Sequence, residues 1–400
     1  MSSKVPTDEI LRRRRAIQDR LSDDSTEGLL ATHAPDVYYL CGDPNVRFLY
    51  LPVEGEALGF RGDLLCGGVR RSDSPNGDGA IRAVSEGIRE NLGRLPRVFG
   101  LTLDVLPVRE YMLFRRFFPG SMMLDCSQSI LGARMVKSDW ELARLDRAAE
   151  ATRRTFDYAR EAMRPGVSEI AFSGLMEARA GELGLSGRVK VRDYKTEGYP
   201  WHVLSGESGG TIGVLDAPAS GEGTSPAFPC GAGYRELKEG EPVMVDFAVQ
   251  MDHYHMDETR ILTMGSMSSK AEDACRAAIE IHDRVLDAVR PGVRAGELYK
   301  RSLDAASRLG YGETYLGPPG NKVRFVGHGI GLELIEPPLL AAGREDVLEP
   351  GMTFALEPKM VFEGEFAAGI ESVFAVTETG YRLISRLPVG ILRAVDRSPT

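Results

Sequence analysis

Few of the residues that mark a disulfide-rich or zinc-stabilised protein are present in this chain. Its 400 residues include five cysteines, which are scattered and form no Cys-x-x-Cys pair. They are Cys41, Cys66, Cys126, Cys230 and Cys275. An odd number of dispersed cysteines argues against a disulfide framework and against a structural zinc site. Reduced thiols fit a cytoplasmic protein.

Long hydrophobic runs and an excess of basic charge are also missing. No apolar run reaches the roughly 18 residues that a membrane span needs, and the N-terminal MSSKVPTDEILRRRR contains no apolar core of a signal peptide. The net charge is -9, whereas nucleic-acid binders carry clustered basic residues. The one basic run, residues 12–15, is interpreted as a solvated helix face. We expect a cytoplasmic protein with neither a nucleic-acid nor a membrane partner.

The first third of the chain alternates helix-like and strand-like segments. Apolar residues recur at helical spacing in residues 8–22, AIRAVSEGIRENLGRL and VREYMLFRRFF. The runs EGLLATHAPDVYYLCG, RFLYLPVEGEALGFR and RVFGLTL are rich in residues that favour strands. This alternation predicts an α/β domain over residues 1–135, followed by a second domain over residues 136–400.

A duplicated unit is predicted in the second domain. It begins with a long helix that opens at a Ser-x-x-Glu capping box, Ser138 with Glu141. The segment MRPGVSEIAF at 163–172 recurs as VRPGVRAGEL at 289–298, and a later Leu-Gly pair recurs at the same offset of 126 residues. Two matches at one offset indicate a repeated helix-plus-sheet unit, with a site on the pseudo-twofold axis between the halves.

Five potential metal ligands, four carboxylates and one imidazole, occur in strand-like or glycine-rich contexts of this domain. They are Asp246, Asp257, His328, Glu357 and Glu371. Asp246 and Asp257 belong to a predicted hairpin, in which QMDHYHMDE joins the strands VMVDFAV and TRILTM. Buried carboxylates are costly without a cation, and bridging carboxylates with an imidazole suit a pair of divalent first-row metals. The pattern predicts a dinuclear metallohydrolase.

His253 and His255 are rival ligands, because residues i and i+2 face one side of a strand. Both fall in the predicted turn of the hairpin. We therefore leave them out of the expected ligand set.

The arrangement resembles the pita-bread metallopeptidase family, which includes methionine aminopeptidase, aminopeptidase P, prolidase and creatinase. The resemblance rests on Asp-x10-Asp, GHGIGLE, LEPK and a Glu before a β-run, and it covers nearly the whole chain. It implies an α/β creatinase-type N-terminal domain and an α+β pita-bread catalytic domain with an internal pseudo-twofold repeat. In the implied site, Asp246 chelates one metal, Asp257 and Glu371 bridge both, and His328 and Glu357 complete the second. The bridging water would be the nucleophile, and Glu357 would shuttle its proton.

Two substrate-site histidines of that family are replaced in this sequence. Cys230 stands in place of the histidine of a Pro-His-Gly segment, and Ile335 in place of that of a His-Glu-x-Pro segment. Each loss removes a donor worth about 10²–10³ in rate. We expect His202 to substitute as a catalytic and substrate-binding donor, with a surface-loop histidine as the alternative. Cys230, Ile335 and Glu336 are expected to line the substrate site.

The expected activity is hydrolysis of a peptide bond next to proline, as in Xaa-Pro dipeptidase or aminopeptidase P. The alternative is a non-peptidase enzyme on the same scaffold, a C–N hydrolase or a lyase of a small metabolite. A non-catalytic binding protein is a third interpretation, against which the complete ligand set argues. Two divalent ions are expected, with manganese, cobalt, zinc and iron all suitable. By resemblance to the relatives, a homodimer is expected.

Overall fold

The computed structural model describes residues 4–23, 25–61, 64–65, 78–186, 189–193, 201–212 and 217–395. Cys66 lies outside these residues. The chain divides into two compact units, the first comprising Met1–Arg134 with Arg192–Thr196, and the second Met135–Val191 with Glu197–Thr400. The sequence-based division after residue 135 did not include the return of Arg192–Thr196 to the first unit. Among the described residues, no helix has the length and apolar character needed to cross a bilayer.

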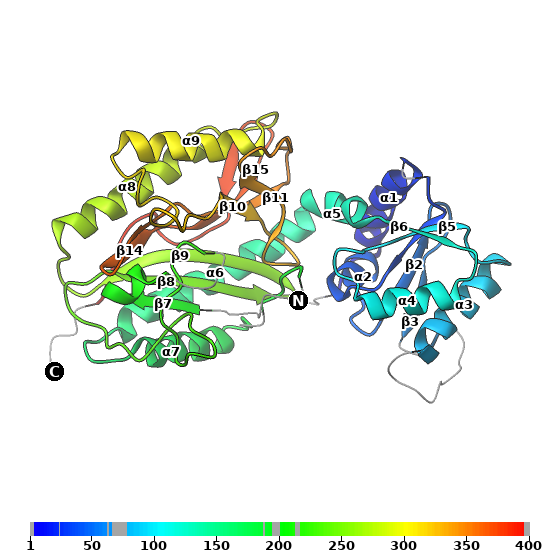
Figure 1. The fold of residues 1–400 in the computed structure, drawn as a ribbon, viewed down its shortest axis with the longest axis horizontal. Helices are drawn as coiled ribbons and strands as arrows, with labels where there is room; N and C mark the ends of the chain where they lie inside the picture. The colour runs from blue at the N-terminus through cyan, green and yellow to red at the C-terminus, as the bar shows by residue number, and fades with distance from the viewer. Residues whose placement is uncertain are drawn as a thin grey trace. The chain divides into compact units, whose positions relative to one another are not determined.

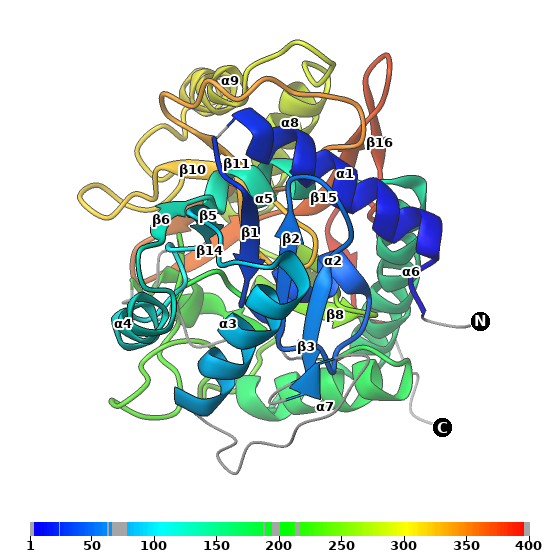
Figure 2. The ribbon, with the colours of Figure 1, turned by 90° about the vertical axis from the view of Figure 1, so that its right-hand side faces the viewer.

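The first unit is built on a mixed sheet with strand order β4-β3-β2-β1-β5-β6 in the described part of the chain. Its strands are β1 (Gly28–Ala31), β2 (Phe48–Pro52), β3 (Leu58–Arg61), β4 (Leu64–Leu65), β5 (Val98–Leu101) and β6 (Met122–Asp125). Its helices are α1 (Thr7–Asp23), α2 (Ala34–Cys41), α3 (Asp78–Leu92), α4 (Val108–Phe117) and α5 (Ser127–Met135). Strand β1 pairs antiparallel with β2 and parallel with β5, and Figure 2 shows β1, β2 and β3 side by side. The predicted α/β class of this unit is confirmed.

Helix α2 corrects one part of the prediction, because residues 34–41 lie in a run that was expected to be strand-rich. Every residue from Pro35 to Leu40 is buried, including the charged Asp36, so no exposed polar positions reveal a helical period. The helix signals are local instead. Proline stands in the first turn, and Gly42 ends the helix with φ of 64°, a left-handed conformation that glycine adopts readily.

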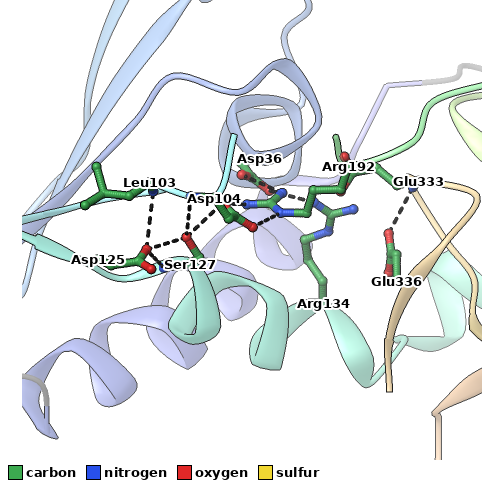
Figure 3. Close-up of polar contacts among 9 residues, drawn as sticks. All are labelled: Asp36, Leu103, Asp104, Asp125, Ser127, Arg134, Arg192, Glu333 and Glu336. Atoms are coloured by element: carbon green, nitrogen blue, oxygen red, sulfur yellow. Dashed lines mark hydrogen bonds and ion pairs between the residues drawn. The ribbon is translucent and has the colours of Figure 1, made fainter. Parts of the chain in front are cut away.

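An ion-pair network around the buried Asp36 ties the returning segment to the first unit. Asp36, on α2, is contacted by Arg134 Nη1 at 2.6 Å and by Arg192 Nη1 at 3.0 Å (Figure 3). Arg192 Nε also lies 2.6 Å from Asp104 Oδ2. The Asp104 carboxylate in turn accepts a hydrogen bond from Ser127 Oγ. Arg192 therefore connects α2 with the segment that follows β5.

The second unit has two halves of similar construction. The first half contains α6 (Asp139–Ala162), α7 (Glu169–Glu182), β7 (Trp201–Ser205), the 3-10 turn η1 (Gly206–Gly210), β8 (Val243–Met251) and β9 (Tyr254–Thr263). The second half contains α8 (Ser269–Leu286), α9 (Ala295–Arg308), β10 (Phe325–Gly329), β11 (Glu336–Ala341), β12 (Thr353–Leu356), β13 (Lys359–Phe362), β14 (Phe366–Gly369), β15 (Ser372–Val376), β16 (Tyr381–Leu383) and β17 (Leu392–Arg393). The strand orders are β17-β9-β8-β7, β11-β10-β12-β15-β16 and β13-β14. Figure 1 shows α6 and α7 on one side of these strands and α8 and α9 on the other.

The helices carry the predicted repeat. Helix α7 spans Glu169–Glu182 and α9 spans Ala295–Arg308, so both their ends are related by the offset of 126 residues found in the sequence. The same offset relates His202 on β7 to His328 on β10. The duplication therefore extends from the helices into the sheets. The two histidines occupy equivalent places in the two halves.

Local signals set the start of α6 and the turn of the hairpin. The predicted capping box is present, since the Ser138 side chain accepts from the Glu141 N–H and the Glu141 side chain accepts from the Ser138 N–H.

The hairpin turn is shorter than expected. Only Asp252 and His253 lie between β8 and β9, with φ of 53° and 70°. His255, predicted in the turn, therefore lies in β9, and that prediction is wrong.

Glu169, at the start of α7, organises the loop that follows β7. Its buried carboxylate accepts hydrogen bonds from Ser205 N at 2.6 Å, Ser205 Oγ at 2.7 Å, Ser208 Oγ at 2.5 Å and Gly233 N at 3.0 Å. These donors come from both ends of a loop that includes Cys230. The carboxylate thus fixes where the loop leaves and rejoins the sheet.

We predict that Glu169→Ala lowers the free energy of unfolding by about 3–5 kcal/mol, because several buried donors lose their acceptor together. Urea denaturation would measure the change. Glu177→Ala, at an exposed position of the same helix, is the control and should stay within about 0.5 kcal/mol of the parent. Equal effects of the two substitutions would contradict this role of Glu169.

Candidate metal centre

The five predicted ligand residues lie together in the second unit. Asp246 is on β8, Asp257 on β9 and His328 on β10, while Glu357 follows β12 and Glu371 precedes β15. In the hairpin register, Ala248 is opposite Asp257. Residues 246 and 248 share a face of β8, so the two aspartates point to the same side, as predicted. The strands of both halves therefore contribute to one buried centre.

Three of these residues offer ligand atoms at distances suited to one metal ion. Atoms of Asp257, His328 and Glu371 lie within 4.8 Å of one another. His328 Nε2 is 3.8 Å from Asp257 Oδ2 and 3.8 Å from Glu357 Oε1. In the described part of the chain, the buried oxygens Asp257 Oδ1 and Glu371 Oε1 have no hydrogen-bond partner. Unpartnered carboxylate oxygens beside an imidazole fit a divalent first-row ion.

Lys359 is a member of this centre that the sequence reasoning missed. Its Nζ lies 2.9 Å from Asp246 Oδ2, 2.8 Å from Glu357 Oε2 and 3.4 Å from Glu371 Oε2, and the side chain is 3% exposed. The sequence held a signal, because Lys359 stands two residues after Glu357 in the LEPK motif. In an extended backbone, residues two apart face the same side.

The electrostatics of the centre show a demand for positive charge. Burial raises the pKa of Asp257 well above its ordinary value, and the neighbouring Asp246 carboxylate adds to the rise. Burial also raises the pKa of Glu371, with a further contribution from Asp257. For Asp246, burial acts in the same direction, but the Lys359 ammonium and His202 lower its pKa overall. Lys359 therefore compensates Asp246, whereas Asp257 and Glu371 still require a cation or protons.

A second layer of polar contacts orients Glu371. Thr259 Oγ1 donates to Glu371 Oε2 at 2.8 Å, and Arg260 Nη1 donates to the Glu371 carbonyl oxygen at 2.5 Å. The buried Arg260 guanidinium lies 3.3 Å from the Glu258 carboxylate. Burial raises the pKa of Glu258 to about 7, although Arg260 opposes the rise. These contacts hold β9 against the residue that precedes β15.

His255 is a structural residue of the same hairpin. Its Nε2 accepts a hydrogen bond from the Lys190 N–H at 3.0 Å, and its Nδ1 lies 3.1 Å from the Gly331 carbonyl oxygen. The Nδ1 atom therefore carries the proton. Gly331 follows His328 in the glycine-rich run, so His255 holds that run against β9. Burial lowers the pKa of His255 to about 4.

The residues expected to bind substrate have different surroundings. His202 pairs with Asp246 across β7 and β8, and its Nδ1 is 3.6 Å from Asp246 Oδ2. Cys230 is buried, and Ile335 is 38% exposed. The buried Glu336 carboxylate lies 3.2 Å from Lys137 Nζ and accepts from the Glu333 N–H at 3.0 Å (Figure 3). The structure thus brings His202 into the cluster, while the substrate roles of all four residues stay predictions.

Comparison with known proteins identifies the family. Residues 143–378, more than half of the chain, match the description "Metallopeptidase family M24". The chain belongs to metallopeptidase family M24. Residues 13–136 match the creatinase/prolidase N-terminal domain. This M24 protein is therefore a metal-dependent hydrolase, and the predicted combination of a creatinase-type domain with a pita-bread domain is confirmed.

Similar proteins of the M24 family cover the chain to different extents. The Xaa-Pro dipeptidase of Lactobacillus helveticus is 24% identical over 383 residues, which are 92% of this chain and 94% of that protein. The probable dipeptidase PepE of Mycobacterium bovis is 34% identical over 155 residues, 38% of this chain and 40% of that protein. The crystal structure of dipeptidase PepE from Mycobacterium ulcerans has a TM-score of 0.78 at 25% identity and covers 98% of this chain and 99% of its own. The structure of Xaa-Pro dipeptidase from Bacillus anthracis, at 22% identity and TM-score 0.78, covers 96% of this chain and 99% of its own and supports the fold alone.

We predict that His255 makes the metal-free protein less stable in acid. Its folded pKa of about 4 lies below the ordinary value of 6.5, so the unfolded chain binds more protons between these two values. The contribution of His255 to the free energy of unfolding is present above pH 6.5, and about 3 kcal/mol is lost as the pH falls to 4.

Urea denaturation from pH 7 to pH 4 would compare the parent protein with His255→Gln. The substitution removes the titrating group, so the difference in stability between the two proteins should shrink as the pH falls. Parallel stability curves over this range would show that His255 does not titrate as its burial implies.

Proposed function

We propose that this protein hydrolyses the peptide bond next to a proline in small peptides, as an Xaa-Pro dipeptidase or aminopeptidase. The observation that carries the proposal is the buried cluster of Asp257, His328 and Glu371 with Glu357 beside it. Two similar proteins that align over nearly their whole length are named Xaa-Pro dipeptidase and dipeptidase PepE. The proposal extends the activity in those names to this chain.

The chemistry follows from the donor atoms of the cluster. A divalent ion supplies a water molecule of lowered pKa and polarises the carbonyl group of the peptide. Asp257, His328, Glu357 and Glu371 would hold the ion. Glu357 is also suited to accept the proton of the attacking water, because Oε1 faces His328 and Oε2 lies 2.8 Å from Lys359. The ammonium holds Glu357 Oε2 in place beside the cluster.

His202 is proposed to donate to the substrate carbonyl oxygen as negative charge develops there. Its ring lies beside Asp246, with Nδ1 3.6 Å from Oδ2, and the carboxylate orients the imidazole. This contribution would partly replace the two donors that are absent at Cys230 and Ile335. Glu336 would act through the loop around Glu333, since its carboxylate is already engaged by Lys137.

A second candidate function is that of a C–N hydrolase or a lyase that acts on a small metabolite. The observation that favours it is the apolar side chain of Ile335, which is 38% exposed where a donor to a peptide carbonyl was expected. A changed pocket around a kept metal centre is a common route to new chemistry. A homodimer, a cytoplasmic location, and manganese, cobalt, zinc or iron as the metal stay predictions.

We predict that Asp257→Asn abolishes hydrolysis of Ala-Pro and Gly-Pro in the presence of manganese or cobalt. The loss in kcat/KM should exceed the roughly 10–100-fold that removal of an outer-shell partner of a metal causes. Asp252→Asn is the matched control, because it changes an aspartate of the same hairpin at its turn, where Asn tolerates a positive φ. An unchanged kcat/KM in Asp257→Asn would rule out this metal-dependent mechanism, and a parent protein without turnover would favour the small-metabolite enzyme.

A second substitution asks whether a peptide is the substrate. We expect Ile335→His to raise kcat/KM for Ala-Pro by about 10-fold or more, because a donor to developing charge is worth up to about 10²–10³. Leu303→His, on α9, is the control, since Leu303 has the same exposure of 38%. A peptidase that gains nothing from the new histidine would show that residue 335 does not face the substrate.

A further inference from the structure

The position expected for one of two metal ions is the position of a lysine. The resemblance to other M24 proteins implies one ion chelated by Asp246 and shared through Glu371. In this chain, the positive group between those two carboxylates is the Lys359 ammonium, at 2.9 Å from Asp246 Oδ2 and 3.4 Å from Glu371 Oε2. It also lies 2.8 Å from Glu357 Oε2.

We propose that the Lys359 ammonium takes the place of one metal ion, so that each chain binds a single divalent ion at Asp257, His328, Glu357 and Glu371. This inference refines the metal centre on which the proposed function rests. It replaces the expected pair of ions by one ion and one fixed ammonium group.

Space is the first argument. A divalent ion such as zinc binds carboxylate oxygens at about 2.0–2.2 Å. An ion bound to the Asp246 and Glu371 oxygens that face Lys359 would lie in the volume that the ammonium occupies. The second ion and the lysine head group therefore exclude each other.

The route of the side chain is the second argument. Lys359 is opposite Gly369 in the β13–β14 pair, and a Cβ atom at Gly369 would lie only 2.6 Å from Lys359 Cγ. The absence of a side chain at residue 369 thus leaves room for the lysine stem. The backbone is also held, because the Lys359 carbonyl oxygen accepts a hydrogen bond from the Leu316 N–H at 2.8 Å. The lysine is built into the sheet that surrounds the centre.

The division of the carboxylate oxygens is the third argument. Glu357 directs Oε2 to Lys359, while its Oε1 lies 3.8 Å from His328 Nε2. Glu371 Oε2 is shared by Lys359 and Thr259. The buried oxygens Glu371 Oε1 and Asp257 Oδ1 have no hydrogen-bond partner among the described residues, and both belong to the cluster of His328. These atoms leave one set of ligands for one ion.

The internal repeat also divides the centre into a metal side and an ammonium side. His328 of the second half stands beside Asp257 and Glu357, whereas its equivalent His202 of the first half stands beside Asp246. Lys359 is in direct contact with Asp246 but not with Asp257. One half of the pseudo-symmetric centre is therefore suited to the metal, and the other half to the ammonium.

Charge balance agrees with a single ion. The four carboxylates carry four negative charges, of which one ammonium and one divalent ion offset three. With a second divalent ion, the total positive charge of the metals and the lysine would exceed the total negative charge of the carboxylates. Lys359 would thus act as a positioning residue that fixes Asp246 and Glu357 and itself binds no metal ion.

Metal stoichiometry tests the inference without relying on activity. The full-length protein would be loaded with excess manganese, dialysed and analysed by inductively coupled plasma mass spectrometry. We expect one manganese per chain in the parent protein and two in Lys359→Ala, in which the site of the ammonium is opened. Lys137→Ala is the matched control, because it removes another buried lysine that pairs with a carboxylate, and it should retain one ion.

Electron paramagnetic resonance provides a second readout. A single Mn²⁺ ion should give an isolated six-line spectrum in the parent protein, and two neighbouring ions in Lys359→Ala should give a broadened, coupled spectrum. Two ions in the parent protein, no ion in it, or one ion in both the parent and Lys359→Ala would each overturn the inference. If Lys359→Ala does not fold, the stoichiometry of the parent protein decides.

Peptide hydrolysis measured on the same samples separates this inference from the proposed function. One ion per chain with no turnover of Ala-Pro would keep the single-ion centre and reject the peptidase. Two ions per chain with turnover would keep the peptidase and reject the role of Lys359.

Discussion

Four carboxylates that lie together at one centre repel one another, and the need to compensate their charge determines how the second unit is built. The compensation comes from Lys359 on β13 at one side and from the cluster of Asp257, His328 and Glu371 at the other. Every strand that carries one of these groups must be held in register, because a slip of one residue would turn the group away from the centre. The hydrogen bonds of Thr259, Arg260 and His255 serve this purpose.

The duplicated architecture explains why such a centre forms between distant parts of the chain. Each half supplies a pair of helices, a histidine-bearing strand, and carboxylates that lie on strands or directly beside their ends. Equivalence in the fold does not require equivalence in chemistry. His202 and His328 occupy matching positions, yet they stand beside different partners. The M24 protein described here combines a symmetric scaffold with an asymmetric distribution of charge.

The features that follow from local sequence were predictable. The capping box at Ser138 involves residues three apart, and the common face of Asp246 and Asp257 follows from the period of two along strands. The five expected ligands also lie together. Their sequence contexts, however, gave no distances, so the separate environments of Asp246 and Asp257 were not foreseen.

What escaped prediction depends on contacts between distant residues. A lysine after Glu-Pro has no pattern of its own, and the role of Lys359 emerges only when β13 is placed against β8. The sequence predicts His255 in a turn because the two-residue turn at Asp252 and His253 lacks glycine. The sequence predicts a strand at helix α2 because its buried residues form no exposed polar face.

Because Arg192 belongs to the first unit, a single cut of the chain does not separate the two units. The chain crosses the boundary between the units more than once, and the segment with Arg192 finds its ion-pair partners, Asp36 and Asp104, in the first unit. A fragment that starts at residue 135 would include Arg192 but neither of these carboxylates. The catalytic unit is therefore discontinuous in sequence, and the first unit cannot be removed or exchanged without altering the connection between α7 and β7.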